Sequence, residues 1–69
     1  MKKLLIYKED DEFVFNRVNE FGTSFKSQFK TIEGLLERLE IYQRMNKLDE
    51  YQLDVSKELW SQVINFLNK

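Results

Sequence analysis

Four consecutive acidic residues near the start of the chain are the first group whose side chains have a recognisable chemistry. Glu9, Asp10, Asp11 and Glu12 carry carboxylate oxygens, which are the ligands that Ca²⁺ prefers. A calcium loop, however, spaces its ligands along the chain and contains a glycine at its sharp turn, and this run has neither feature. A charged run between two apolar stretches is typical of a solvated hairpin turn. We therefore expect a turn here and no metal site.

Catalytic side chains are sparse in the rest of the chain. The sequence contains no histidine and no cysteine, so it lacks the usual general base for neutral pH and a thiol nucleophile. Glu33 and Glu37 are paired carboxylates, but they lie on a predicted helix surface, where solvation is the rule. No glycine-rich phosphate loop is present. The sequence thus predicts a protein without enzymatic activity, catalytic residues or cofactor.

Apolar side chains are abundant by comparison. Hydrophobic residues make up 42% of the 69-residue chain and aromatic residues 14%, including six phenylalanines. A domain of this size buries only about 60% of its unfolded-chain surface, and no disulfide adds to its stability. Its stability must come from an apolar core or from self-association. We expect one small domain over residues 1–69, with a homodimer as one of its forms.

The first apolar run follows two lysines, in the manner of an export signal. Leu4–Tyr7 is much shorter than the roughly 7–15 apolar residues of such a signal, and the chain contains no alanine for a cleavage site. No later segment approaches the roughly 18 apolar residues of a membrane helix. We therefore interpret the run as a strand and expect a cytoplasmic protein that does not bind membranes.

Three segments in the first thirty residues have the pattern of β-strands. Residues 3–8 form a short apolar run, residues 13–18 are rich in strand formers, and residues 24–30 alternate between polar and apolar side chains. The acidic run and a segment around Gly22 supply the turns between them. Because these connections are short, they favour an antiparallel meander.

Thr31 marks a change to helical spacing, and its hydroxyl is suited to cap the start of a helix. The apolar side chains that follow share one stripe: Ile32, Leu35, Leu36, Leu39, Tyr42 and Met45. Gly34 weakens this helix and permits close packing on the sheet. Glu40 and Arg44 are spaced for an ion pair on one helix face.

A second helix is predicted at the end of the chain. Residues 46–53 have the pattern of a loop with a helical turn, and Asp54 is a suitable helix cap. The apolar stripe of this helix is formed by Val55, Leu59, Val63, Phe66 and Leu67. Trp60 lies beside the stripe, where it either packs at the edge of the core or is a partly exposed contact residue. The predicted fold is α+β, a three-stranded antiparallel meander followed by two helices packed on one face (β-β-β-α-α).

This layering leaves apolar side chains on both faces of the sheet. Alternation along the strands places one set together, and we assign it to the core: Phe13, Phe15, Phe25 and Phe29. The opposite set is left half exposed, because two helices cover only one face: Leu5, Tyr7, Val14 and Val18. An uncovered apolar patch of this kind indicates an interface. These four side chains are the predicted partner-binding residues.

The composition and this patch together predict a small protein-interaction module. We expect a regulator or inhibitor that binds and occludes a partner protein; the same patch could instead close a symmetric dimer. The chain contains no alanine or proline and is rich in residues with AT-rich codons, which points to a low-GC bacterium or one of its phages.

The alternative is a small nucleic-acid-binding domain that uses its sheet, on which the phenylalanines would stack bases. The element order over residues 3–45 resembles the small sheet-reading DNA-binding domains at the N-termini of some phage-type integrases. That resemblance implies a basic sheet, whereas this sheet offers mainly Lys8, Arg17 and Lys26, and the formal net charge is −1. A helix-turn-helix is not expected, because residues 46–53 exceed its short turn. Protein is therefore the predicted partner rather than nucleic acid.

Overall fold

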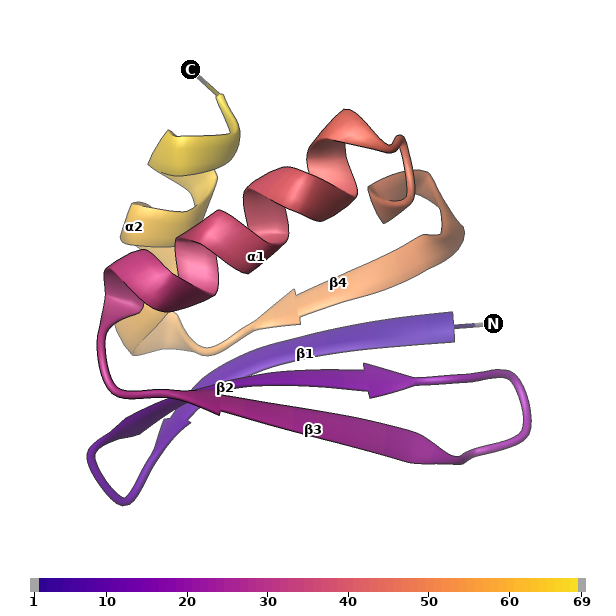
Figure 1. Ribbon diagram of the computed structural model, residues 1–69, viewed down its shortest axis with the longest axis horizontal. Helices are drawn as coiled ribbons and strands as arrows, with labels where there is room; N and C mark the ends of the chain where they lie inside the picture. Colours follow the sequence, from indigo (N-terminus) through magenta and orange to yellow (C-terminus); the bar gives the residue numbers. More distant parts are fainter. Residues whose placement is uncertain (1, 69) are drawn as a thin grey trace.

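Residues 2–68 are described by a computed structural model, in which two helices cover one face of a β-sheet (Figure 1). The elements in chain order are β1 (Lys2–Glu9), β2 (Glu12–Val18), β3 (Ser24–Phe29), α1 (Ile32–Arg44), a 3-10 turn η1 (Leu48–Glu50), β4 (Tyr51–Val55) and α2 (Lys57–Leu67). The predicted α+β class and the three predicted N-terminal strands are confirmed.

The sheet has four strands in the order β3-β2-β1-β4, so the predicted three-stranded sheet is only part of it. The pairs β1/β2 and β2/β3 are antiparallel, as the predicted meander requires. β4 pairs with the other side of β1 and runs parallel to it. The sheet is therefore mixed, and β3 and β4 form its two edges.

β4 corrects the assignment of residues 46–53 as a loop with a helical turn. The helical turn is present as η1, but a strand begins directly after it at Tyr51. Leu53 lies opposite Leu4 and Val55 opposite Ile6 in the parallel ladder. These pairings extend the apolar layer of the sheet beneath the helices, which is a tertiary reward that helical spacing alone does not reveal.

The start of the last helix is corrected by the same strand. Val55 and Asp54, predicted as a helix-stripe residue and as the helix cap, both belong to β4. The residue that precedes α2 is Ser56, and its side chain makes no capping hydrogen bond.

Both hairpin turns form where the sequence places them. Asp10 and Asp11 have φ angles of 51° and 65° and form a two-residue turn between the paired Glu9 and Glu12. Aspartate tolerates this left-handed backbone better than most residues, which suits a tight hairpin turn. The second turn uses Gly22, with a φ of 85°. The acidic run is therefore a turn, as predicted.

The beginning of α1 also follows the sequence. The Thr31 Oγ1 accepts a hydrogen bond of 3.2 Å from the Gly34 N–H, which is the predicted cap. The absence of a Cβ at Gly34 brings the helix close to β3, because a Cβ there would lie 3.2 Å from Phe29 Cδ1. The predicted ion pair between Glu40 and Arg44 forms on the helix surface.

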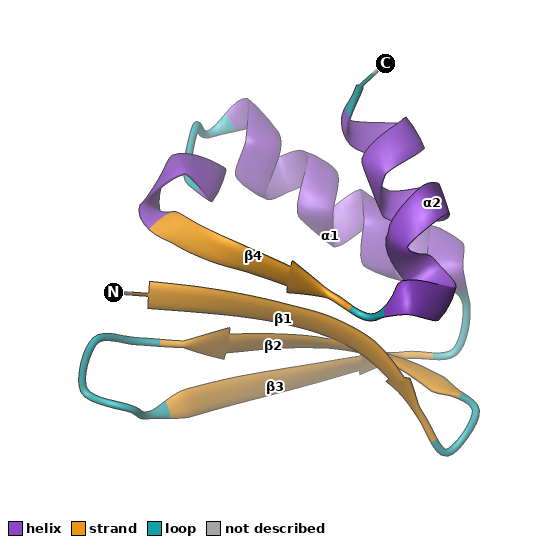
Figure 2. Cartoon of the chain, turned by 180° about the vertical axis from the view of Figure 1, so that it is seen from behind, coloured by secondary structure: helices purple, strands orange, loops and turns teal. Residues whose placement is uncertain are grey.

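The core lies between the sheet and the two helices, which cover the same face in both views (Figures 1 and 2). Its fully buried side chains come from β1, β2, α1 and α2: Leu4, Ile6, Phe15, Leu35, Leu39, Leu59 and Val63. The Phe15 ring meets the Tyr42 ring edge-on, with centroids 5.2 Å apart. These contacts join the sheet to α1 and fix the helix layer in place.

The phenylalanine face is only partly buried. Phe15 is fully buried, and Phe13 and Phe29 are half-buried against the core, as the prediction requires. Phe25 is 50% exposed, so its assignment to the core is wrong. Phe25 lies next to the β2–β3 turn, whereas α1 begins only two residues beyond the opposite end of β3.

Candidate interaction surfaces

The face of the sheet opposite the helices, called the open face here, brings the four predicted partner-binding residues together. In the β1/β2 ladder, Tyr7 lies opposite Val14, Leu5 opposite Asn16, and Lys3 opposite Val18. Since opposite residues share a face, Leu5, Tyr7, Val14 and Val18 occupy one surface on two neighbouring strands. Both helices lie on the other side of the sheet.

The four residues are not equally exposed. Val14 is fully buried, whereas Leu5, Tyr7 and Val18 are half-buried. Val14 is a short side chain between Tyr7 on β1 and Gln28 on β3, and these longer neighbours stand higher above the sheet. Val14 is therefore part of the support of the open face rather than its contact surface, which corrects its predicted role.

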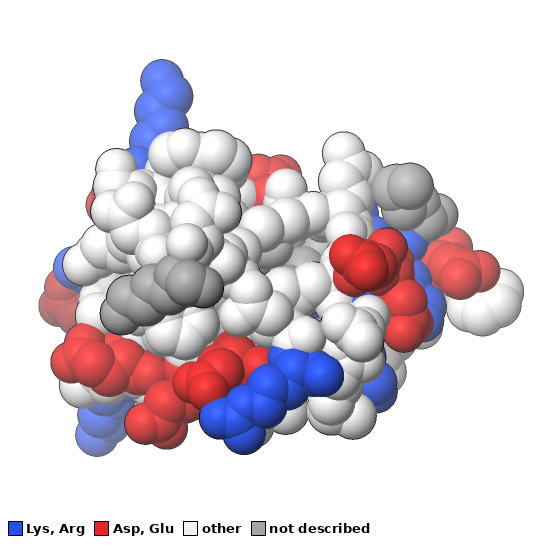
Figure 3. Space-filling model, turned by 90° about the horizontal axis from the view of Figure 1, so that it is seen from above, with Lys and Arg blue, Asp and Glu red and all other residues white. Residues whose placement is uncertain are grey.

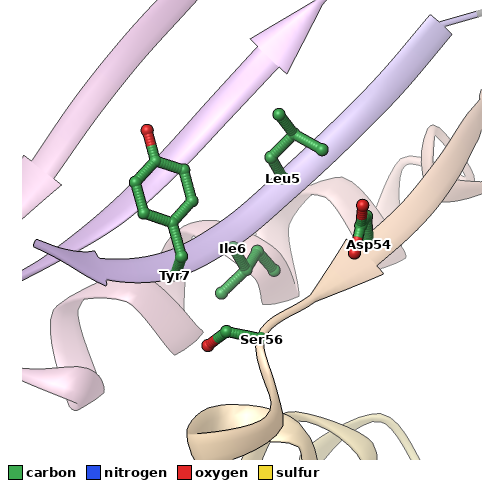
Figure 4. Close-up of a pocket in the computed structure, with 5 residues that line it drawn as sticks. All are labelled: Leu5, Ile6, Tyr7, Asp54 and Ser56. Atoms are coloured by element: carbon green, nitrogen blue, oxygen red, sulfur yellow. The ribbon is translucent and has the colours of Figure 1, made fainter.

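A shallow hollow of about 180 Å³ lies on this face, beside the carboxyl ends of the parallel strands β1 and β4 (Figure 4). Its lining residues are Leu5, Ile6, Tyr7, Asp54 and Ser56. The Ser56 N–H donates a hydrogen bond of 2.9 Å to the Ile6 C=O, which ties the start of α2 to β1. The lining is mostly apolar, with one carboxylate and one hydroxyl at its border.

Two buried polar atoms at this side of the sheet have no hydrogen-bond partner: the Ser56 hydroxyl oxygen and Asn16 Oδ1. Asn16 lies between Leu5 on β1 and Lys26 on β3. Unpaired buried polar groups are rare in folded proteins because each carries a desolvation cost. Sequence patterns do not reveal such atoms, because they arise only when the strands and α2 pack together.

Charged side chains border the apolar part of the open face. Lys26 Nζ lies 2.6 Å from Glu9 Oε1. The hydrogen bond to the Glu9 carboxylate raises the pKa of the Lys26 ammonium group above its ordinary value. Lys3 and Asp54 are exposed further along the same face. The result is a half-exposed apolar centre with a charged rim, which is the general organisation of protein–protein interfaces.

A second apolar surface lies at the β3 side of the molecule, and the sequence did not predict it. Arg38, Ile41 and Met45 are spaced by three and four residues and form one stripe on α1. The Arg38 guanidinium lies 5.6 Å from the centre of the Phe29 ring, so this stripe faces the β3 side. On the opposite side of α1, Gln43 Nε2 donates a hydrogen bond to the main-chain oxygen of α2 residue 67.

This β3-side surface, made of Phe25, Phe29, Arg38, Ile41 and Met45, holds most of the strongly exposed apolar side chains. Phe25, Ile41 and Met45 are 50%, 48% and 57% exposed. The Arg17 guanidinium covers one face of Phe25, 5.3 Å from the ring centre. Met45 was predicted to lie in the core, and that prediction is wrong. The available signal was that Ile41 departs from the apolar stripe of its helix.

The helix side is largely uncharged near its centre, with charged side chains gathered towards its edges (Figure 3). The chain carries no charged residue from Leu59 to Asn68. Trp60 is 50% exposed, which supports its interpretation as a partly exposed contact residue over full core packing. The half-buried and buried phenylalanines lie beneath α1 and α2, where bases cannot stack on them.

Within residues 2–68, no three acidic side chains are grouped so that they could hold a metal ion. Neither helix in that range is long and apolar enough to cross a membrane. The fold is thus a two-layer α+β domain with one uncovered sheet face. Comparison with protein families, curated proteins and solved structures found no match to this chain.

Proposed function

We propose that this chain is a small, non-enzymatic protein-interaction module that binds a partner protein through the open face of its sheet. The observation that carries this proposal is the layering: both helices cover one face, while Leu5, Tyr7 and Val18 remain half exposed on the other. Burial of such side chains contributes about 25 cal/mol per Å² of apolar surface.

The area required is within reach of a chain this small. A standard interface buries about 800 Å² on each partner, which is roughly a sixth of the 4927 Å² accessible surface of this structure. The hollow beside Tyr7 would accept a partner side chain. A hydrogen-bond donor on that side chain would satisfy the Ser56 hydroxyl oxygen, which has no internal partner. Charged residues at the rim would set orientation more than affinity.

The mechanism that fits this surface is steric. A bound copy would cover a patch of the partner and exclude its other ligands, as expected for a regulator or inhibitor. The composition places the natural partner in a low-GC bacterium or its phage. Catalysis plays no part in this mechanism.

Photo-crosslinking from the open face tests the proposal. A benzophenone amino acid at Tyr7 should crosslink one defined protein in a low-GC bacterial lysate, and excess wild-type protein should compete with it. The same probe at Trp60, which is exposed on the helix side, is the matched control. Leu5→Lys should abolish the crosslink without unfolding the chain. The purified partner should then lose activity when this protein is added in equal amount. Identical crosslinks from positions 7 and 60 would contradict the proposal.

A further inference from the structure

The edge strand β3 has a row of backbone groups that face away from the sheet. The Asn19 N–H donates a hydrogen bond of 2.9 Å to the Thr23 C=O, so these two residues form a hydrogen-bonded pair at the end of the β2/β3 ladder. Hydrogen-bonded and non-hydrogen-bonded pairs alternate along an antiparallel ladder. The register continues without interruption to the pair of Phe13 and Phe29.

This alternation identifies the groups at the free edge. Phe25, Ser27 and Phe29 direct their N–H and C=O groups towards β2, because their pairs follow the Asn19–Thr23 pair in steps of two. The N–H and C=O groups of the intervening residues, Ser24, Lys26 and Gln28, therefore point outwards. All three of these residues are exposed.

β3 also lacks the usual protection of an edge strand. Proteins shield such strands with proline, with a bulge or with free charges. The chain contains no proline, and the β2/β3 register has no bulge. The one charged side chain of β3 is Lys26, and it is held by Glu9. The other edge strand, β4, is shorter and contains Asp54, with Asp49 and Glu50 directly before it, so two copies of β4 would repel each other.

We propose that β3 pairs with β3 of a second copy of this chain, antiparallel and centred on Ser27, so that the two sheets become one. The outward groups allow only registers that place Ser24, Lys26 and Gln28 opposite one another. Centring on Lys26 would set two ammonium groups face to face, and like charges directly opposite are destabilising. Centring on Ser27 sets Lys26 opposite Gln28 of the second copy and Phe25 opposite Phe29 of the second copy.

The Ser27 register also accounts for the β3-side surface. Cross-strand aromatic pairs stabilise a sheet, and the two Phe25–Phe29 pairs would cover rings that are exposed in one copy alone. The stripe containing Ile41 and Met45 would meet its symmetry mate above the joint. Arg17 and Arg38 both stack on these rings. Their mutual repulsion opposes the pairing, so added salt should strengthen the dimer. This inference does not depend on the proposed function of the open face.

Single-cysteine crosslinking gives a sharp test, because the chain has no cysteine of its own. In the proposed register, Ser27 faces its own mate in a non-hydrogen-bonded pair, in which Cα atoms are about 4.5 Å apart. That separation is within the range of a disulfide. Ser27→Cys should therefore form a covalent dimer on mild oxidation. Ser24→Cys, on the same strand but far from its own mate, should stay at the background level set by Ser61→Cys on α2.

Sedimentation equilibrium of the cysteine-free protein completes the test. We expect a reversible monomer–dimer equilibrium that shifts towards dimer as salt is raised. Gln28→Pro removes an outward N–H that β2 does not use, so it should give a folded monomer with an unchanged circular dichroism spectrum. A strict monomer at millimolar concentration, equal crosslinking at positions 24 and 27, or species larger than a dimer would each overturn the proposal. The last outcome would indicate β3-to-β4 association instead.

Discussion

Phe29 Cδ1 lies 3.2 Å from the position that a Cβ on Gly34 would occupy. This contact joins the last residue of β3 to the first turn of α1. It explains why glycine stands in a helix, where it costs about 1 kcal/mol relative to alanine. The close approach also brings the α1 residue Arg38 over the same ring.

Gly34→Ala is therefore expected to gain much less stability than helix propensity alone predicts. The gain of about 1 kcal/mol from the alanine is opposed by the contact between its Cβ and the Phe29 ring. Replacing the ring by Phe29→Leu relieves that contact, so Gly34→Ala should recover most of the gain in the Phe29→Leu background. Urea unfolding of the four proteins in this cycle measures the coupling. A full gain in the wild-type background would show that the ring yields freely.

The two residues that precede the helices provide a second comparison. Thr31→Ala should destabilise the protein by about 1 kcal/mol, since it removes a side-chain cap of α1. Ser56→Ala should leave stability unchanged or raise it slightly, because this hydroxyl caps nothing and is buried without a partner. Thermal unfolding at one pH distinguishes them. Equal losses for the two variants would mean that Ser56 does cap α2 in solution.

A third prediction concerns the two valines of the open face. Val14→Ala should destabilise the protein by about 2 kcal/mol, because Val14 is fully buried and its loss leaves a cavity. Val18→Ala is the matched control and should cost clearly less, since Val18 is half-buried. Chemical unfolding of both variants provides the measurement. Similar losses at the two positions would place Val14 on the contact surface after all.

The ion pair between Lys26 and Glu9 predicts a pH dependence with a definite sign. The hydrogen bond from Lys26 to the Glu9 carboxylate raises the pKa of Lys26 in the folded protein above its ordinary value of 10.5. A raised folded-state pKa adds stability that is complete below the unfolded-state pKa and is lost as the pH rises through the folded-state value. The stability advantage of the wild type over Glu9→Gln should therefore be constant near pH 8–9 and shrink above about pH 10.5. An advantage that persists at pH 12 would exclude this pair as its source.

Much of the first forty-five residues could be predicted because the relevant interactions are local. The Thr31 hydroxyl reaches the Gly34 N–H three residues ahead, and the turn at Asp10 and Asp11 connects strands that adjoin it in sequence. Alternation along β1 and β2 also placed Leu5, Tyr7 and Val18 correctly on one face. Each of these signals depends on residues that are neighbours along the chain.

The exposure of individual side chains could not be predicted in the same way. Phe25 and Met45 were expected in the core, yet both are at least half exposed. Val14 was expected at the surface and is buried. Burial depends on the height of neighbours on other strands and on how far each helix extends over the sheet.

Sequence periodicity alone was enough to establish an α+β chain with an N-terminal meander, a capped helix and one apolar face for each helix. The place of β4 was settled only by three-dimensional packing. Its alternating segment is five residues long, and Val55 fitted a helical stripe equally well. Parallel pairing with β1 joins residues that lie about fifty positions apart, and it is favoured because Leu53 and Val55 then cover the core beside Leu4 and Ile6. That arrangement left β3 as a free edge and one face of the sheet without a second layer.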